Sequence, residues 1–186
     1  MFICAAFEYA GGAKSGAAFK NMVNSISTNA LVNNVCAGID AEMDYNTPTL
    51  TRAWVDGFSS AGTSEILYNF GDHAGRTDDF SSETDPVFNN GWKASDIHYV
   101  SYGNSCSFVV PQIYVEGMAK QWTYQKKWEY LSFSGVMSTN DWTSSGDFYK
   151  NQESYNTLTT WLNNNNLGQT LSNKTWISLL PAAQPN

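Results

Sequence analysis

Short apolar runs alternate along this chain with longer stretches in which apolar residues recur at helical spacing. Six apolar runs, at 2–7, 35–39, 65–70, 97–102, 108–114 and 131–137, predict strands. Apolar residues recur every three or four positions at 17–26, 50–58, 118–125 and 148–162, and this spacing predicts helices. Thr47-Pro48 predicts the start of the second helix, because Thr is favoured as an N-cap and Pro at the first helical position. Strands that are apolar throughout and alternate with helices predict an α/β fold with a parallel sheet.

Polar side chains gather at the carboxyl ends of the predicted strands: Glu8, Asp40 with Glu42, Asp72, Tyr102, Gln112 with Tyr114, and residues 138–140. A β/α barrel places its active site at this edge, whereas a doubly wound sheet concentrates it at one switch point. Polar groups at six different strand ends therefore favour a TIM-type (β/α) barrel. Because such a barrel has eight strands, we expect this one to lack its first two strand–helix units. Residues 1–186 would then form a single domain, a fragment of a longer barrel.

The tripeptide Asp40-Ala41-Glu42 closes the second apolar run and carries the most specific chemistry in the chain. Side chains alternate along a strand, so both carboxylates point the same way, with Cα atoms roughly 6.6 Å apart. Carboxylates that close repel, and one should hold its proton to higher pH than the other. An acid beside a base is what hydrolysis of a glycosidic bond requires. The alternative is a solvated strand end with two surface acids.

Gln112-Ile113-Tyr114 repeats this geometry at a later predicted strand end. A Gln amide and a Tyr hydroxyl can both bind a sugar hydroxyl or an acetamido carbonyl. The alternative is a strand that simply runs into a loop.

These two motifs, with the Trp-bearing helix at 118–128 and the apolar run at 131–137, resemble the glycoside-hydrolase barrels of the lysozyme type (family 25) and the chitinase-like type (family 18). The resemblance covers roughly residues 1–140. It implies that Glu42 is the general acid, that Asp40 stabilises positive charge or orients an acetamido group, and that Tyr114 holds that group. Glu8 and Asp72 would supply carboxylates from other strands. The chitinase-type pattern has further acids earlier on the strand, where this chain has Gly38 and Val35.

Composition adds a carbohydrate signal and removes other classes. Aromatic residues make up 15% of the chain, and flat rings stack on sugar faces; Trp92, Trp142 and Tyr45 near loop ends are candidates, although aromatic rings also serve as core packing. The net charge of −7 argues against nucleic acid and anionic membranes as partners. The low charge and abundant Asn, Ser, Thr, Trp and Tyr indicate an extracellular or cell-surface protein, although residues 1–10 do not resemble a signal peptide. For the three cysteines, buried thiols are favoured over a disulfide.

The sequence therefore predicts a monomeric glycoside hydrolase-like protein that acts on a polysaccharide, with N-acetylated sugars as one class, and needs no metal or cofactor. A non-catalytic carbohydrate-binding barrel is the first alternative. A metal-dependent hydrolase is the second, with Asp72, His73 and His98 joining Asp40 and Glu42 as ligands.

Overall fold

A computed structural model describes residues 2–5, 12–28, 36–61, 66–73, 75–139, 151–168 and 175–178. The first half of this part contains β1 (Phe2–Ala5), α1 (Gly12–Ser27), β2 (Cys36–Ile39), α2 (Pro48–Ser60) and β3 (Leu67–Asn69). The second half contains η1 (Asn89–Gly91), α3 (Ala94–His98), the π-helix η2 (Tyr99–Gly103), β4 (Ser107–Val109), α4 (Glu116–Trp128), β5 (Val136–Thr139), α5 (Asn151–Asn164) and β6 (Thr175–Ser178).

The strands form two parallel sheets. One sheet has four strands in the order β1-β2-β3-β4, and the other pairs β5 with β6. Two isolated parallel bridges run between the sheets: Val109, the last residue of β4, pairs with Phe133, and Gln112, beyond β4, pairs with Met137 in β5. The parallel pairing and the strand–helix alternation predicted from the sequence are confirmed.

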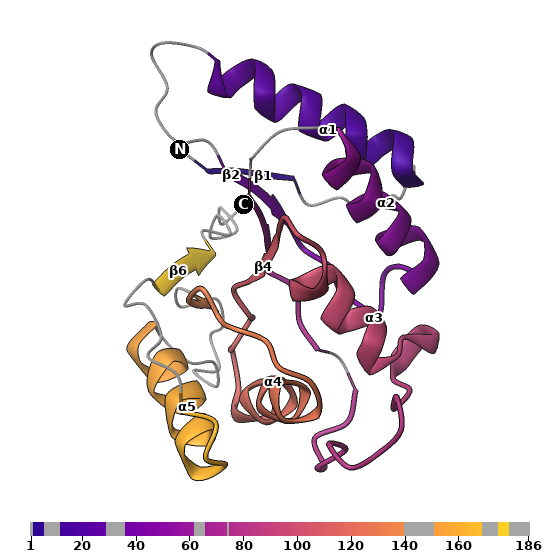
Figure 1. Ribbon diagram of the computed structural model, residues 1–186. Coiled ribbons are helices and arrows are strands. Elements are labelled where there is room, and N and C mark those ends of the chain that lie inside the picture. The colour runs from indigo at the N-terminus through magenta and orange to yellow at the C-terminus, as the bar shows by residue number, and fades with distance from the viewer. Residues whose placement is uncertain are drawn as a thin grey trace, which may run out of the picture.

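The TIM-type barrel, and with it the reading of the chain as a barrel without its first two units, is wrong. The described residues form an open four-stranded sheet and a two-stranded one, linked only by the two isolated bridges, and no ring of strands closes among them (Figure 1). The alternation of strands and helices dictates parallel pairing, but it does not dictate that a sheet curls into a ring.

The predicted strand at 97–102 is also wrong, because this segment is helical. It spans the end of α3 and the π-helix η2. Its buried side chains are Ile97, Val100 and Ser101, at positions i, i+3 and i+4, which is the spacing of one helix face. Two further predicted strands are shorter in the structure than expected. Within 108–114 only β4 and the Gln112 bridge form, and within 131–137 only the Phe133 bridge and the start of β5 form.

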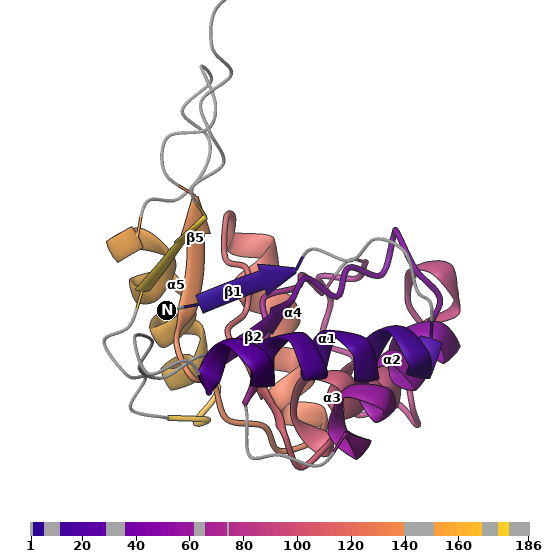
Figure 2. The ribbon, with the colours of Figure 1, turned by 90° about the horizontal axis from the view of Figure 1, so that it is seen from above.

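The four predicted helices are confirmed as α1, α2, α4 and α5. Helix α2 starts at Pro48 with Thr47 in the N-cap position, although the Thr47 side chain makes no capping hydrogen bond. Helix α1 packs against α2, and α4 packs against α5 (Figures 1 and 2). No helix among the described residues is both long and apolar enough to cross a membrane.

Two glycines allow α1 and α2 to touch through their backbones. A Cβ at Gly57 would lie 1.9 Å from Ala13 O, and a Cβ at Gly16 would lie 1.9 Å from Trp54 O. Neither helix can therefore carry a side chain at these positions without moving away from the other.

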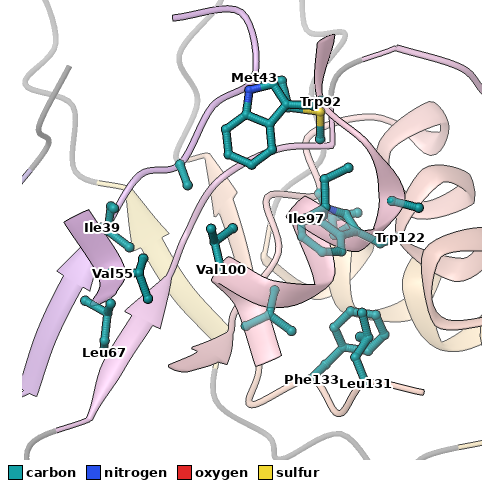
Figure 3. Close-up of a cluster of buried hydrophobic side chains, with 14 of the residues drawn as sticks. Ile39, Met43, Val55, Leu67, Trp92, Ile97, Val100, Trp122, Leu131 and Phe133 are labelled. Atoms are coloured by element: carbon teal, nitrogen blue, oxygen red, sulfur yellow. The ribbon is translucent and has the colours of Figure 1, made fainter. Parts of the chain in front are cut away.

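The core between the helices and strands is rich in aromatic and β-branched residues (Figure 3). Fully buried members come from helices and strands alike, including Val55 on α2, Leu67 on β3 and Trp122 on α4. The connection between β3 and α3 contributes Phe80 and Trp92 to the same core, so these parts of it are packed rather than solvated.

Candidate functional site

The two sequence motifs singled out above meet in the structure. Gln112 Nε2 lies 3.0 Å from Asp40 Oδ1 and 3.3 Å from Glu42 Oε1. Asp40 and Glu42 follow β2, and Gln112 follows β4, so the amide reaches across the end of the intervening strand β3. The amide nitrogen has two hydrogens, and each carboxylate accepts one. Gln112 is itself 5% exposed, whereas both acids are half-buried, so solvent reaches the acids more readily than the amide.

Asn69, at the end of β3, holds the backbone between the two acids. Its Oδ1 accepts hydrogen bonds from Ala41 N at 3.3 Å and from Gly71 N at 2.9 Å, and its Nδ2 donates to Ser101 Oγ at 2.9 Å. Asn69 is 1% exposed, and all three partners are buried with it. Sequence reasoning missed this residue. The available signal was a single amide inside an otherwise apolar strand.

Gly71 brings the ends of β2 and β3 together. A Cβ at this position would lie 2.2 Å from Ala41 O, so only glycine permits this approach. The backbone of Gly71 also accepts a 3.3 Å hydrogen bond from Gln112 N. One glycine thus sets the spacing between the Asp40–Glu42 pair and the strand end that carries Gln112.

Asp72 and His73 follow Gly71 but differ in environment. Asp72 is half-buried, whereas His73 is fully buried with ring centroids 4.7 Å from Phe88 and 5.5 Å from both Phe80 and Trp122. His73 Nε2 lies 2.9 Å from Gln125 Oε1, and Gln125 Nε2 donates to Ala94 O at 3.0 Å. Because the Gln125 oxygen can only accept, His73 carries its proton on Nε2.

Burial lowers the pKa of His73 to about 4, because the charged imidazolium is poorly solvated among aromatic rings. The hydrogen bond with Gln125 opposes this shift only in part. His73 is therefore neutral at pH 7 and serves the core between the β3 end and α4.

Tyr114 lies two residues beyond Gln112 and is half-buried. Its backbone N–H contacts Met118 Sδ at 3.3 Å, which ties it to the first turn of α4. Glu8 and Trp142, the other predicted candidates near the strand ends and loops, lie outside the described residues.

The structure differs from the predictions for Tyr102, expected at a strand end, and for Trp92, expected as an accessible ring. Tyr102 lies in the π-helix, not at a strand end, and its ring contacts His98 and Tyr130. Trp92 is 1% exposed, so its ring is a core element and not an accessible sugar platform. Its Nε1 donates a 2.7 Å hydrogen bond to Asn46 O, in the loop that follows Glu42.

The residues suggested as metal ligands do not assemble. Within the described part of the chain, no group of three or more His, Cys, Asp or Glu side chains is arranged to hold a metal ion. His98, the second histidine, lies 2.9 Å from Tyr130 O through Nε2 and 3.7 Å from the Glu129 carboxylate through Nδ1. Of the three cysteines, Cys36 and Cys106 are free thiols.

The chain matches no protein-family model, no curated protein and no solved structure.

Proposed function

We propose that this protein is a glycoside hydrolase that cleaves a polysaccharide with the Asp40–Glu42 pair. One observation carries the proposal: a single buried amide, Gln112, contacts both carboxylates from another strand end, at 3.0 and 3.3 Å. Two surface acids on a solvated strand end would need no such partner. A fixed, half-open pair of carboxylates is the equipment for acid–base cleavage of a glycosidic bond.

In the proposed reaction, Glu42 gives its proton to the glycosidic oxygen as the bond between that oxygen and the anomeric carbon breaks. Glu42 Oε1 accepts the Gln112 N–H, so the proton to be transferred is carried on Oε2. Asp40 remains ionised and stabilises the positive charge that develops on the sugar ring. Water then adds to the anomeric carbon and gives a proton to the Glu42 carboxylate, which restores the acid and completes the hydrolysis. Tyr114 and Asp72 are proposed to bind sugar hydroxyl or acetamido groups beside the pair.

A non-catalytic carbohydrate-binding protein is the second candidate, and a specific observation favours it. The Gln112 amide nitrogen can only donate hydrogen bonds, so Asp40 Oδ1 and Glu42 Oε1 both act as acceptors. Two acceptor oxygens held side by side are also suited to binding sugar hydroxyl groups without breaking a bond.

The substitution Glu42→Gln separates these functions. If Glu42 is the acid, turnover of chitohexaose, cellohexaose or peptidoglycan falls by about 10²–10⁴-fold, because an amide cannot donate the proton. Reducing-end release is the measurement. Glu129→Gln is the matched control, because Glu129 is exposed and lies beyond the carboxyl end of α4. Equal turnover by wild type and Glu42→Gln would contradict the acid role, and sugar binding with no cleavage by the wild type would establish the binding function. A two-carboxylate mechanism needs no metal, so activity is expected to survive EDTA.

A further inference from the structure

Tyr45 stands out on the surface next to the proposed site. Of the large apolar side chains that the structure describes, Tyr45 and Tyr130 are the most exposed, at 64% and 66%. Tyr45 lies three residues beyond Glu42, and its backbone N–H donates to Glu42 O at 3.3 Å in a tight turn. This turn fixes the backbone of Tyr45 relative to that of Glu42, the proposed general acid.

The residues on either side of Tyr45 are held by another loop. Asp44 Oδ1 accepts a 2.9 Å hydrogen bond from Asn89 Nδ2. Asn46 O accepts two more, from Asn90 Nδ2 at 3.0 Å and from Trp92 Nε1 at 2.7 Å. Met43, which precedes this segment, is 1% exposed and lies beside the Trp92 ring (Figure 3). Hydrogen bonds therefore hold the residues on both sides of Tyr45, whose own side chain is 64% exposed.

An anchored, exposed tyrosine is a good surface for stacking. Tyrosine offers a large contact area at low entropic cost, because few of its bonds must be frozen. Hydrogen bonds that order the loop in advance reduce the cost further. A pyranose ring presents a face of C–H groups that matches such a surface.

The charges nearby restrict which sugar can lie there. Asp40, Glu42 and Asp44 lie within five consecutive positions, and the chain has a net charge of −7. A sugar that carries a carboxylate would be repelled by this field. A neutral ring would not.

We propose that Tyr45 forms a stacking subsite for a neutral pyranose ring, one position along the sugar chain from the bond held at Asp40 and Glu42. This subsite rests on the proposed carbohydrate function and adds to it both a second contact and a substrate class. Trp92 acts here as a positioning residue, because it holds the loop without touching the sugar.

The test is the affinity for chitohexaose and cellohexaose, measured by calorimetry in the Glu42→Gln background so that no cleavage occurs. Tyr45→Ala is expected to weaken binding about tenfold, whereas Tyr45→Phe stays within about twofold of the parent, because stacking needs the ring and not the hydroxyl. Tyr130→Ala is the matched control. Tyr130 is as exposed as Tyr45, but it precedes the Phe133 bridge, at the opposite edge of the parallel strands. Hexagalacturonate is expected not to bind.

Each outcome has a separate meaning. Unchanged affinity in Tyr45→Ala, an equal loss in Tyr130→Ala, or no binding of either neutral hexasaccharide by the parent would overturn the subsite. Tight binding of hexagalacturonate would overturn the neutral class. The proposed hydrolysis is judged independently, by the turnover of wild type against Glu42→Gln. A subsite without turnover and turnover without a subsite are therefore distinguishable results.

Discussion

Gln112 Nε2 donates a 3.0 Å hydrogen bond to Asp40 Oδ1, although 72 positions separate the two residues along the chain. The same amide group reaches Glu42 Oε1 at 3.3 Å. One side chain from the end of β4 thus holds two acids from the end of β2. The amide therefore fixes the position of the two carboxyl groups relative to each other.

Replacing Gln112 with Met should damage both stability and activity. The thioether has a similar length but no N–H, so two carboxylates lose a hydrogen bond each, at a cost of about 1–3 kcal/mol in unfolding free energy. Turnover of chitohexaose should fall as well, since the acids are no longer oriented. Urea unfolding and reducing-end release are the measurements.

Gln121→Met is the matched control for Gln112→Met. Gln121 is 7% exposed and donates through Nε2 to Gly75 O at 3.1 Å, so it is a buried amide with a neutral partner. It should lose stability with turnover per folded molecule unchanged. An equal loss of turnover in both variants would refute a specific role for Gln112.

Asn69→Leu tests the support beneath the acids. The leucine has a similar volume, but it leaves the Ala41 N–H, the Gly71 N–H and the Ser101 hydroxyl without the partners they have now. A loss of at least about 2 kcal/mol in unfolding free energy is expected, because buried donors without acceptors are costly. Ser101→Ala removes only one of the three contacts and should cost less. Denaturation midpoints for Asn69→Leu that match the wild type would exclude this supporting role.

The meeting of Asp40, Glu42 and Gln112 follows from one rule that can be applied to sequence: the carboxyl ends of parallel strands lie at one edge. Closure of a barrel follows from no such rule, because it depends on strand tilt and stagger around a whole sheet. The alternation of strands and helices was therefore a sound guide to pairing and a poor guide to overall architecture.

Other failures have local causes. The run at 97–102 is apolar enough for a strand, but the spacing of Ile97, Val100 and Ser101 is helical, and the structure follows the spacing. Trp92 was predicted to face a sugar because it lies in a loop, yet large aromatic rings in loops often close the core. Asn69 was overlooked because a lone amide in an apolar strand has no motif around it, and only the fold reveals its three partners.

Gly57→Ala tests the contact between α1 and α2. The added methyl group would lie 1.9 Å from Ala13 O, so the helices must separate. Overpacking of this kind typically costs about 1–3 kcal/mol, which exceeds the gain that alanine gives in a helix. Gly117→Ala on α4 is the control, because its Cβ would meet only Thr77 Cγ2 at 3.4 Å; that variant should be neutral or more stable by up to about 1 kcal/mol. The melting temperature should fall for Gly57→Ala and stay the same or rise for Gly117→Ala, and a Gly57→Ala protein as stable as the wild type would contradict the close packing.

His73 should make the fold sensitive to mild acid. Burial lowers the pKa of His73 from 6.5 to about 4 in the folded protein, whereas the unfolded chain titrates near the ordinary value. Above about pH 6.5 both states are neutral at this residue, and its contribution to stability is complete. Between about pH 6.5 and 4 the unfolded state binds the proton more readily, so stability falls with pH, and below about pH 4 the loss levels off. A shift of this size corresponds to roughly 3 kcal/mol.

The variant His73→Gln separates the contribution of His73 to the pH dependence of stability from that of the carboxylates, which also titrate in acid. Its amide can still donate to Gln125 Oε1, which accepts from His73 Nε2 in the wild type, but it carries no charge at any pH. The unfolding free energy, measured in urea at steps from pH 7.5 to 4, should fall more steeply for the wild type than for His73→Gln, and the difference should accumulate between pH 6.5 and 4. At pH 7.5 the variant is expected to be the less stable protein, because the amide fills the space between Phe80, Phe88 and Trp122 less well than the imidazole ring. If the unfolding free energies of wild type and His73→Gln fall in parallel across this range, burial does not hold His73 neutral, and the prediction is wrong.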